Sequence, residues 1–235
     1  MAYDAKRRQK KLAKKAAKRK TKLVSRRHES LARESGPARI LSYEISDEPL
    51  PELAYERLPA QVKDELKTLY EELLLQKPKE ALGVLKPLIE QYPDVPQLYN
   101  YLHTAYRELG DQTQAQRVLQ ETLERFPDYL FGRIAYATDC LQRGETEKVP
   151  EIFDNKYDLK LLYPERKRFH ISEVLGFCAA MAWYFHSRAE SDRAEMYYKL
   201  MRQLDPEHRN TRLIEGLLYP SRLDTLLRRL VGREP

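Results

Sequence analysis

The residues best suited to bind a ligand by charge lie in the first 33 positions of the chain. This segment holds eight lysines and six arginines against Asp4 and Glu29, a net charge of +12. Cations at this density neutralise successive phosphates of a nucleic acid and release its counterions, so they bind without reading the base sequence. We expect phosphate contacts from Lys6, Arg7, Arg8, Lys10, Lys11, Lys14, Lys15, Lys18, Arg19, Lys20, Lys22, Arg26 and Arg27.

The composition of this basic segment also limits its partners. No aromatic residue for base stacking lies between Lys6 and Arg33, so recognition of particular bases is not expected. RNA, including ribosomal RNA, fits the charge, and so does DNA. Two alternatives stay open. The segment could dock on an anionic membrane, although it lacks the apolar face of interfacial helices, or on the protein's own body, because residues 34–235 carry a net charge of −6.

The sequence carries no recognisable catalytic or metal-binding pattern. It has no His-Glu-x-x-His pair, no Cys-x-x-Cys pair, no glycine-rich phosphate loop and no Gly-x-Ser-x-Gly turn. Cys140 and Cys178 stand alone within apolar patterns, which predicts buried free thiols. We therefore expect no enzymatic activity, no metal and no cofactor. The five histidines, which show no metal-ligand spacing, are His28, His103, His170, His186 and His208.

Composition also bears on the compartment. One third of the residues are charged, and the mean hydropathy is −0.72. No apolar run approaches the roughly 18 residues that a membrane-spanning helix needs. The N-terminus is basic and lacks the apolar segment of a secretory signal. We therefore expect a cytoplasmic protein without a transmembrane segment.

The elements that would position these residues begin with the tail and a linker. Residues 1–34 are rich in helix formers, but like charges such as Lys10 and Lys14 repel at helical spacing, which predicts a disordered or transiently helical tail. Residues 35–59 combine prolines and acidic residues with apolar ones. Prolines at this density prevent a continuous helix. We expect an extended linker that packs on the body and covers its first helix pair.

The body repeats with a period of 34 residues. Tyr92-Pro93-Asp94 returns as Phe126-Pro127-Asp128, and Pro59 lies one period before Pro93. Between these prolines, apolar residues at helical spacing run on both sides of a turn at Gly110. A proline-bounded unit of this length predicts an array of helix–turn–helix pairs. Further matches one period apart are Gly110 with Gly144, Ala81 with Ala115, and Leu85 with Leu119 and Phe153.

These motifs resemble the tetratricopeptide repeat (TPR) family. The resemblance implies an all-α, right-handed α-solenoid of about four helix pairs over residues 60–218, with residues 219–235 as a C-terminal helical cap and tail. The second unit matches best, at Tyr99, Leu102, Tyr106, Gly110, Ala115, Leu119 and Pro127. Later units depart from the pattern: Val149 replaces the expected small alanine, and Pro206 lies 11 residues beyond the position that the period predicts.

The resemblance also implies a binding surface, because first helices of TPR units line a groove that takes a peptide. The implied groove residues are Tyr70, Asn100, Tyr101, Thr104, Arg107, Phe131, Ile134, Thr138, Trp183 and His186. Leu66, Leu73 and Leu74 would add an apolar patch under the linker, and Trp183 is alternatively a core residue. The cationic clamp that some members use for a peptide carboxylate is not matched, which argues against a chaperone-tail adaptor.

Two segments are open to two interpretations each. The phase slip places an insertion at residues 154–174, where basic and aromatic residues gather. This insertion is either a protrusion that contacts a partner or RNA, or a structural element that fills a gap between units. At the C-terminus, four leucines (Leu223, Leu226, Leu227 and Leu230) form a helical stripe that predicts a cap or, alternatively, a homodimer contact.

The sequence thus predicts a non-enzymatic protein-binding scaffold or adaptor. Its array would bind a protein, and its basic tail would attach to nucleic acid in a salt-sensitive way. The alternative is a self-assembling structural protein in which the tail of one copy binds the acidic body of another.

Overall fold

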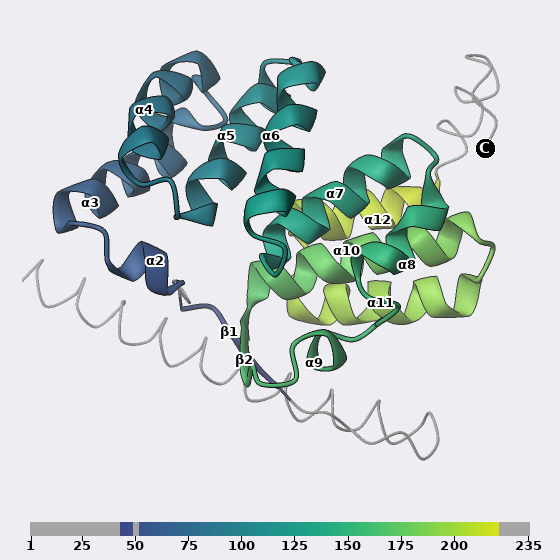
Figure 1. Cartoon of the computed structure of the whole chain (residues 1–235). Coiled ribbons are helices and arrows are strands. Elements are labelled where there is room, and N and C mark those ends of the chain that lie inside the picture. The colour runs from purple at the N-terminus through teal and green to yellow at the C-terminus, as the bar shows by residue number, and fades with distance from the viewer. Residues whose placement is uncertain (1–42, 49–51, 221–235) are drawn as a thin grey trace, which may run out of the picture. The chain divides into compact units, whose positions relative to one another are not determined.

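The computed structural model describes residues 43–48 and 52–220, and most of them lie in helices (Figure 1). The chain divides into two compact units. Unit 1 contains residues 43–48 and 144–220 of the described chain, and unit 2 contains residues 52–143. The thirteen predicted phosphate-contacting residues and the leucine stripe of the C-terminus lie outside the described residues.

Unit 2 is a succession of helices, each packed on the next. They are α2 (Leu53–Glu56), α3 (Ala60–Thr68), the π-helical turn η1 (Leu69–Leu73), α4 (Pro78–Gln91), α5 (Pro96–Glu108), α6 (Gln112–Arg125) and α7 (Leu130–Gln142). The sequence sets the boundaries of α5 and α6 locally. Pro96 begins α5, Gly110 ends that helix with a φ of +74°, and the Asp111 carboxylate accepts from the Gln114 amide at 3.1 Å. The helix pair expected between Tyr92 and Pro127 is therefore α5 with α6.

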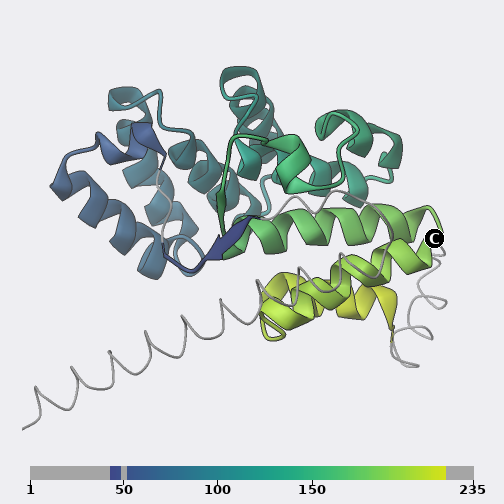
Figure 2. The same ribbon diagram turned by 90° about the horizontal axis from the view of Figure 1, so that it is seen from below.

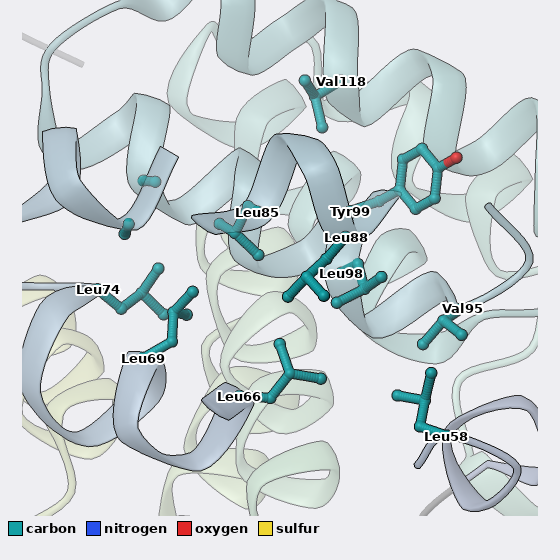
Figure 3. Close-up of a cluster of buried hydrophobic side chains, with 12 residues drawn as sticks. Leu58, Leu66, Leu69, Leu74, Leu85, Leu88, Val95, Leu98, Tyr99 and Val118 are labelled. Carbon is teal, nitrogen blue, oxygen red and sulfur yellow. The ribbon is translucent and has the colours of Figure 1, made fainter. Parts of the chain in front are cut away.

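A cluster of buried leucines holds the first helices of unit 2 together (Figure 3). In this cluster, Leu85 of α4 and Leu98 of α5 meet three leucines that come before them in the chain. These are Leu66 of α3, Leu69 of η1 and Leu74 directly after η1. Each fully buried leucine stabilises the fold by about 1.5–3 kcal/mol, so these side chains do not remain at a surface. Leu66, Leu73 and Leu74 were expected to form an apolar patch under the linker. Leu66 and Leu74 are core residues, and Leu73 packs against the same core together with Ala54 and Tyr55 of the linker.

The linker takes a different course from the expected extended one. Residues 53–56 form the short helix α2, and its Ala54 and Tyr55, with Leu58 after it, pack against the leucine cluster of unit 2. Residues 43–48, in contrast, belong to unit 1. Each half of the described linker therefore packs on a different unit.

Unit 1 is built around one long apolar helix. Its elements are β1 (Glu44–Ser46), the 3₁₀ turn η2 (Thr146–Lys148), α8 (Val149–Ile152), α9 (Leu159–Leu162), β2 (Arg168–His170), α10 (Ile171–Ser187), α11 (Ser191–Leu204) and α12 (Arg209–Leu218). Helix α10 contacts α11, α12 and both strands, as Figures 1 and 2 show. It is buried on most sides because its residues are apolar all round, and this is typical of a central helix.

The two strands were not expected, because each is only three residues long. They pair in parallel, with Glu44 opposite Arg168, Ile45 opposite Phe169 and Ser46 opposite His170. Three residues are too few for alternation of apolar and polar residues to be recognised in a sequence. The pairing joins the linker to the insertion of residues 154–174, whose last four residues already belong to α10.

The helix pair that starts with α7 is also irregular. Its second helix is reduced to η2 and α8, because Asp154 and Asn155 adopt φ values of +52° and +55°, which a right-handed helix cannot include. Val149 and Phe153 are nevertheless fully buried. Phe153 thus keeps the core role of Leu119 and Leu85, the residues one and two periods earlier.

Two further findings concern membrane spans and thiols. No helix within residues 43–48 and 52–220 is long and apolar enough to cross a bilayer. Cys140 and Cys178 are both buried free thiols, and burial raises the pKa of Cys178 well above its usual value.

Candidate functional site: a tyrosine patch and three partly exposed helix stripes

Two tyrosines of unit 2 form the most distinctive surface feature among the predicted groove residues. Tyr70 in η1 is 61% exposed, and its ring lies 5.7 Å from the ring of Tyr101 in α5, centroid to centroid. The Tyr101 hydroxyl accepts a hydrogen bond from the Gln97 amide at 2.6 Å. Burial raises the pKa of Tyr101 to about 12, and Tyr55 and Tyr70 add to this effect. We call Tyr55, Tyr70, Gln97 and Tyr101 the tyrosine patch.

The π-helical turn explains why Tyr70 is exposed although Leu69 before it and Leu74 after it are both buried. The Leu74 amide donates to the Leu69 carbonyl at 2.9 Å, five residues back, so the turn is one residue wider than an α-helical turn. The wider turn allows both Leu69 and Leu74 to reach the core. Tyr70, between them in sequence, is left outside beside Tyr101. Single π-turns of this kind are frequent at functional sites.

The other predicted residues of α5 are polar and lie next to the patch in sequence. Thr104 is tied to its own helix, since its hydroxyl donates to the Asn100 carbonyl at 2.9 Å. Burial lowers the pKa of His103 to about 4, and the nearby positive charge of Arg107 contributes. His103 is therefore neutral at pH 7 and is not a proton donor near neutrality. Arg107 itself is exposed and adds one positive charge to α5.

The predicted residues of α5 (Asn100, Tyr101, Thr104 and Arg107) form a first stripe. Helix α7 presents a second stripe, formed by Phe131, Ile134 and Thr138. All three are half-buried, while Ala137 and Cys140 between and beyond them are fully buried. The Thr138 hydroxyl donates to the Ile134 carbonyl at 2.8 Å, so this stripe offers mainly apolar surface.

A third stripe lies on α10 in unit 1. Ala179, Trp183 and His186 are half-buried, whereas the intervening Met181 and Phe185 are buried. The spacing of four and three residues places them on one side of the helix. The side of α10 that the TPR resemblance assigns to a groove is thus the side left partly exposed. The exposure of Trp183 is intermediate, between that expected of a groove residue and that expected of the alternative core residue.

Sequence reasoning missed Tyr55 and the π-turn. Tyr55 lies in the proline-rich linker, where nothing in its spacing marks it, and it joins the patch because α2 folds onto unit 2. A π-turn has no reliable sequence signal, since an ordinary α-helix fits the same residues. Of the predicted groove residues, the structure brings Tyr70 and Tyr101 into ring contact, and it places Trp183 and His186 in the other unit.

The insertion of residues 154–174 has a buried aromatic part and a cationic surface part. Phe169 is fully buried, with Tyr43 edge-on at 5.0 Å and the Arg166 guanidinium 4.2 Å from its ring centre. The Glu173 carboxylate accepts from Arg166 at 2.7 and 3.0 Å and from the His170 amide at 2.9 Å, which caps α10. The aromatic residues of the insertion therefore act structurally.

The chemistry of these surfaces is that of binding through shape and apolar contact. No group of histidine, cysteine or carboxylate side chains suited to a metal occurs in the described part of the chain. Comparison with protein-family models finds none that matches the chain, and comparison with curated protein sequences finds no match either. The TPR resemblance therefore depends on the residues themselves.

Proposed function

We propose that the protein is a non-enzymatic scaffold of TPR type, in which unit 2 binds a protein segment through the tyrosine patch. The supporting observation is Tyr70. A tyrosine that is 61% exposed and rests on a second, half-buried tyrosine provides a large, rigid contact area with little conformational entropy to lose. Tyrosine is also among the residues that most often carry binding energy at protein interfaces.

The proposal has a second half, which concerns the basic tail. Residues 1–33, with a net charge of +12, attach the scaffold to the phosphate backbone of a nucleic acid, RNA being the first candidate. The contrast in charge supports this assignment, because the described residues 43–48 and 52–220 hold 31 acidic and 23 basic residues.

Affinity purification of the intact chain, with and without nuclease, followed by mass spectrometry tests the protein-binding half. A partner of the tyrosine patch survives nuclease treatment and is lost when Tyr70→Ser is used as bait. Tyr219→Ser is the matched control, since Tyr219 is 54% exposed and lies in unit 1. Partners that are captured equally by all three baits would contradict a role for the patch.

Binding of a 20-nucleotide uridine RNA tests the tail half. The intact chain should bind with an affinity that falls steeply as salt rises, and a chain without residues 1–33 should bind far more weakly. Equal affinity of the two chains, or affinity indifferent to salt, refutes this half.

A further inference from the structure

We propose that residues 160–168 form a second phosphate-contacting surface, which holds the backbone of the nucleic acid that the tail binds. This inference rests on the proposed function of the tail and adds a site to it. The surface is defined by four cations, Lys160, Arg166, Lys167 and Arg168, and we call it the insert surface.

The first observation is where the described chain begins, at Tyr43. Strand β1 begins directly after residues 1–42, and it is fixed on β2 by main-chain pairing. The Glu44 amide donates to the Lys167 carbonyl at 2.9 Å, and Tyr43 packs on Phe169. The described chain therefore begins beside the insert surface. Residues 28–42 separate the last predicted contact, Arg27, from Tyr43, and fifteen residues span at most about 50 Å.

The second observation is the charge of this surface. Residues 160–168 carry four basic residues and one acidic residue, Glu165, whereas the rest of the described chain carries 19 basic and 30 acidic residues. The insert surface is thus a cationic segment on an acidic body, and it lies beside Tyr43, where the described chain begins. A polyanion held by the tail is attracted here, while the net negative charge of the remaining described residues repels it.

The third observation is which of these charges remain available. Glu173 holds Arg166, and Glu44 lies 3.4 Å from Arg168. The Lys160 ammonium group donates hydrogen bonds to main-chain carbonyls, among them that of Arg166 at 2.9 Å. These neutral acceptors do not cancel its positive charge, which stays near the surface. Lys167 is exposed and has no ion-pair partner among residues 43–48 and 52–220. Lys167 is therefore the cation best placed to contact a phosphate.

Tethering makes such a weak contact effective. Once the tail has bound, the nucleic acid is held near the insert surface at an effective concentration that short linkers bring into the millimolar range. A single lysine–phosphate contact then adds to affinity and to salt dependence, although it would not hold a nucleic acid alone.

The test compares the intact chain with its Lys167→Gln and Lys199→Gln variants, using the 20-nucleotide uridine RNA at several salt concentrations. Lys199 is the control because it is an exposed lysine of the same unit, on α11. We expect Lys167→Gln to reduce the slope of log affinity against log salt by about 0.7, the value for one phosphate contact on a single strand, with affinity lowered a few-fold. Lys199→Gln should match the unchanged chain.

A second measurement locates the contact directly. Lysine acetylation followed by mass spectrometry should show that RNA protects Lys167 and leaves Lys199 reactive in the same sample. If the intact chain binds RNA but Lys167→Gln behaves like Lys199→Gln and Lys167 is not protected, the insert surface is not a contact and the tail assignment stands. If the intact chain does not bind RNA at all, the proposed function of the tail fails as well.

Discussion

Replacing Glu173 with alanine should destabilise unit 1 strongly, since this carboxylate serves three donor groups. It accepts two hydrogen bonds from the Arg166 guanidinium and one from the His170 amide at the start of α10. Loss of a helix cap costs about 1 kcal/mol. Loss of the partner of a mostly buried arginine costs about 2 kcal/mol more, a value reduced because the Arg166 side chain is 34% exposed. We therefore expect Glu173→Ala to lower the free energy of unfolding by about 3 kcal/mol.

The assay uses the only tryptophan of the chain, Trp183, which lies on the same helix as Glu173. Urea unfolding followed by tryptophan fluorescence therefore reports on unit 1. Glu173→Gln should cost about half as much, because the amide oxygen still accepts from His170. Glu190→Ala is the control. Glu190 also pairs with two arginines, but the Arg188 and Arg193 side chains are 53% and 47% exposed, and pairs with exposed partners contribute little. A loss below about 1 kcal/mol for Glu173→Ala would refute this reasoning.

Two further predictions concern unit 2 and are followed by urea unfolding with far-UV circular dichroism. The pKa of His103 is about 4 in the fold against an ordinary value of 6.5, so the unfolded chain binds more protons between these pH values. Stability should therefore fall by up to roughly 3 kcal/mol as pH drops from 6.5 to 4, and His103→Gln should flatten this dependence. An unchanged pH dependence in the variant would show that His103 is not the cause. Gly83→Ala in α4 should stabilise by about 0.5–1 kcal/mol, because nothing lies within 4 Å of the added methyl group. Gly132→Ala should instead cost about 1–3 kcal/mol, because its methyl group would lie 3.3 Å from Cγ2 of Thr122. Equal effects of the two glycine substitutions would contradict this packing between α6 and α7.

Much of the helical architecture could be predicted because its signals are local. The prolines at 93 and 127 and the glycine at 110 delimit α5 and α6, and the 34-residue spacing of Leu85, Leu119 and Phe153 identifies buried positions. Such features depend on dihedral angles and on periodic burial, both of which a sequence carries directly.

The parts that could not be predicted depend on long-range contacts or on small changes in helix geometry. Pairing of β1 with β2 joins residues more than 120 positions apart, through strands too short to show a pattern. The π-turn at η1 separates two residues that were expected on the same side of the helix, since Leu74 is buried and Tyr70 is exposed. The predicted groove residues of α7 and α10 are half-buried, and their role in binding stays a prediction. The sequence could not show that Tyr55 would join Tyr70 and Tyr101.

The pairing of β1 with β2 also has a consequence for the order in which the protein folds during its synthesis. Unit 1 is discontinuous, so residues 43–48 are made long before their partners at 168–170. At the usual 5–20 residues per second, about 6–25 seconds pass between the two. Tyr43 and Ile45 remain without their partners on β2 in this interval, during which all of unit 2 is synthesised. The first described residues of the protein thus find their partners only after all of unit 2 has been made.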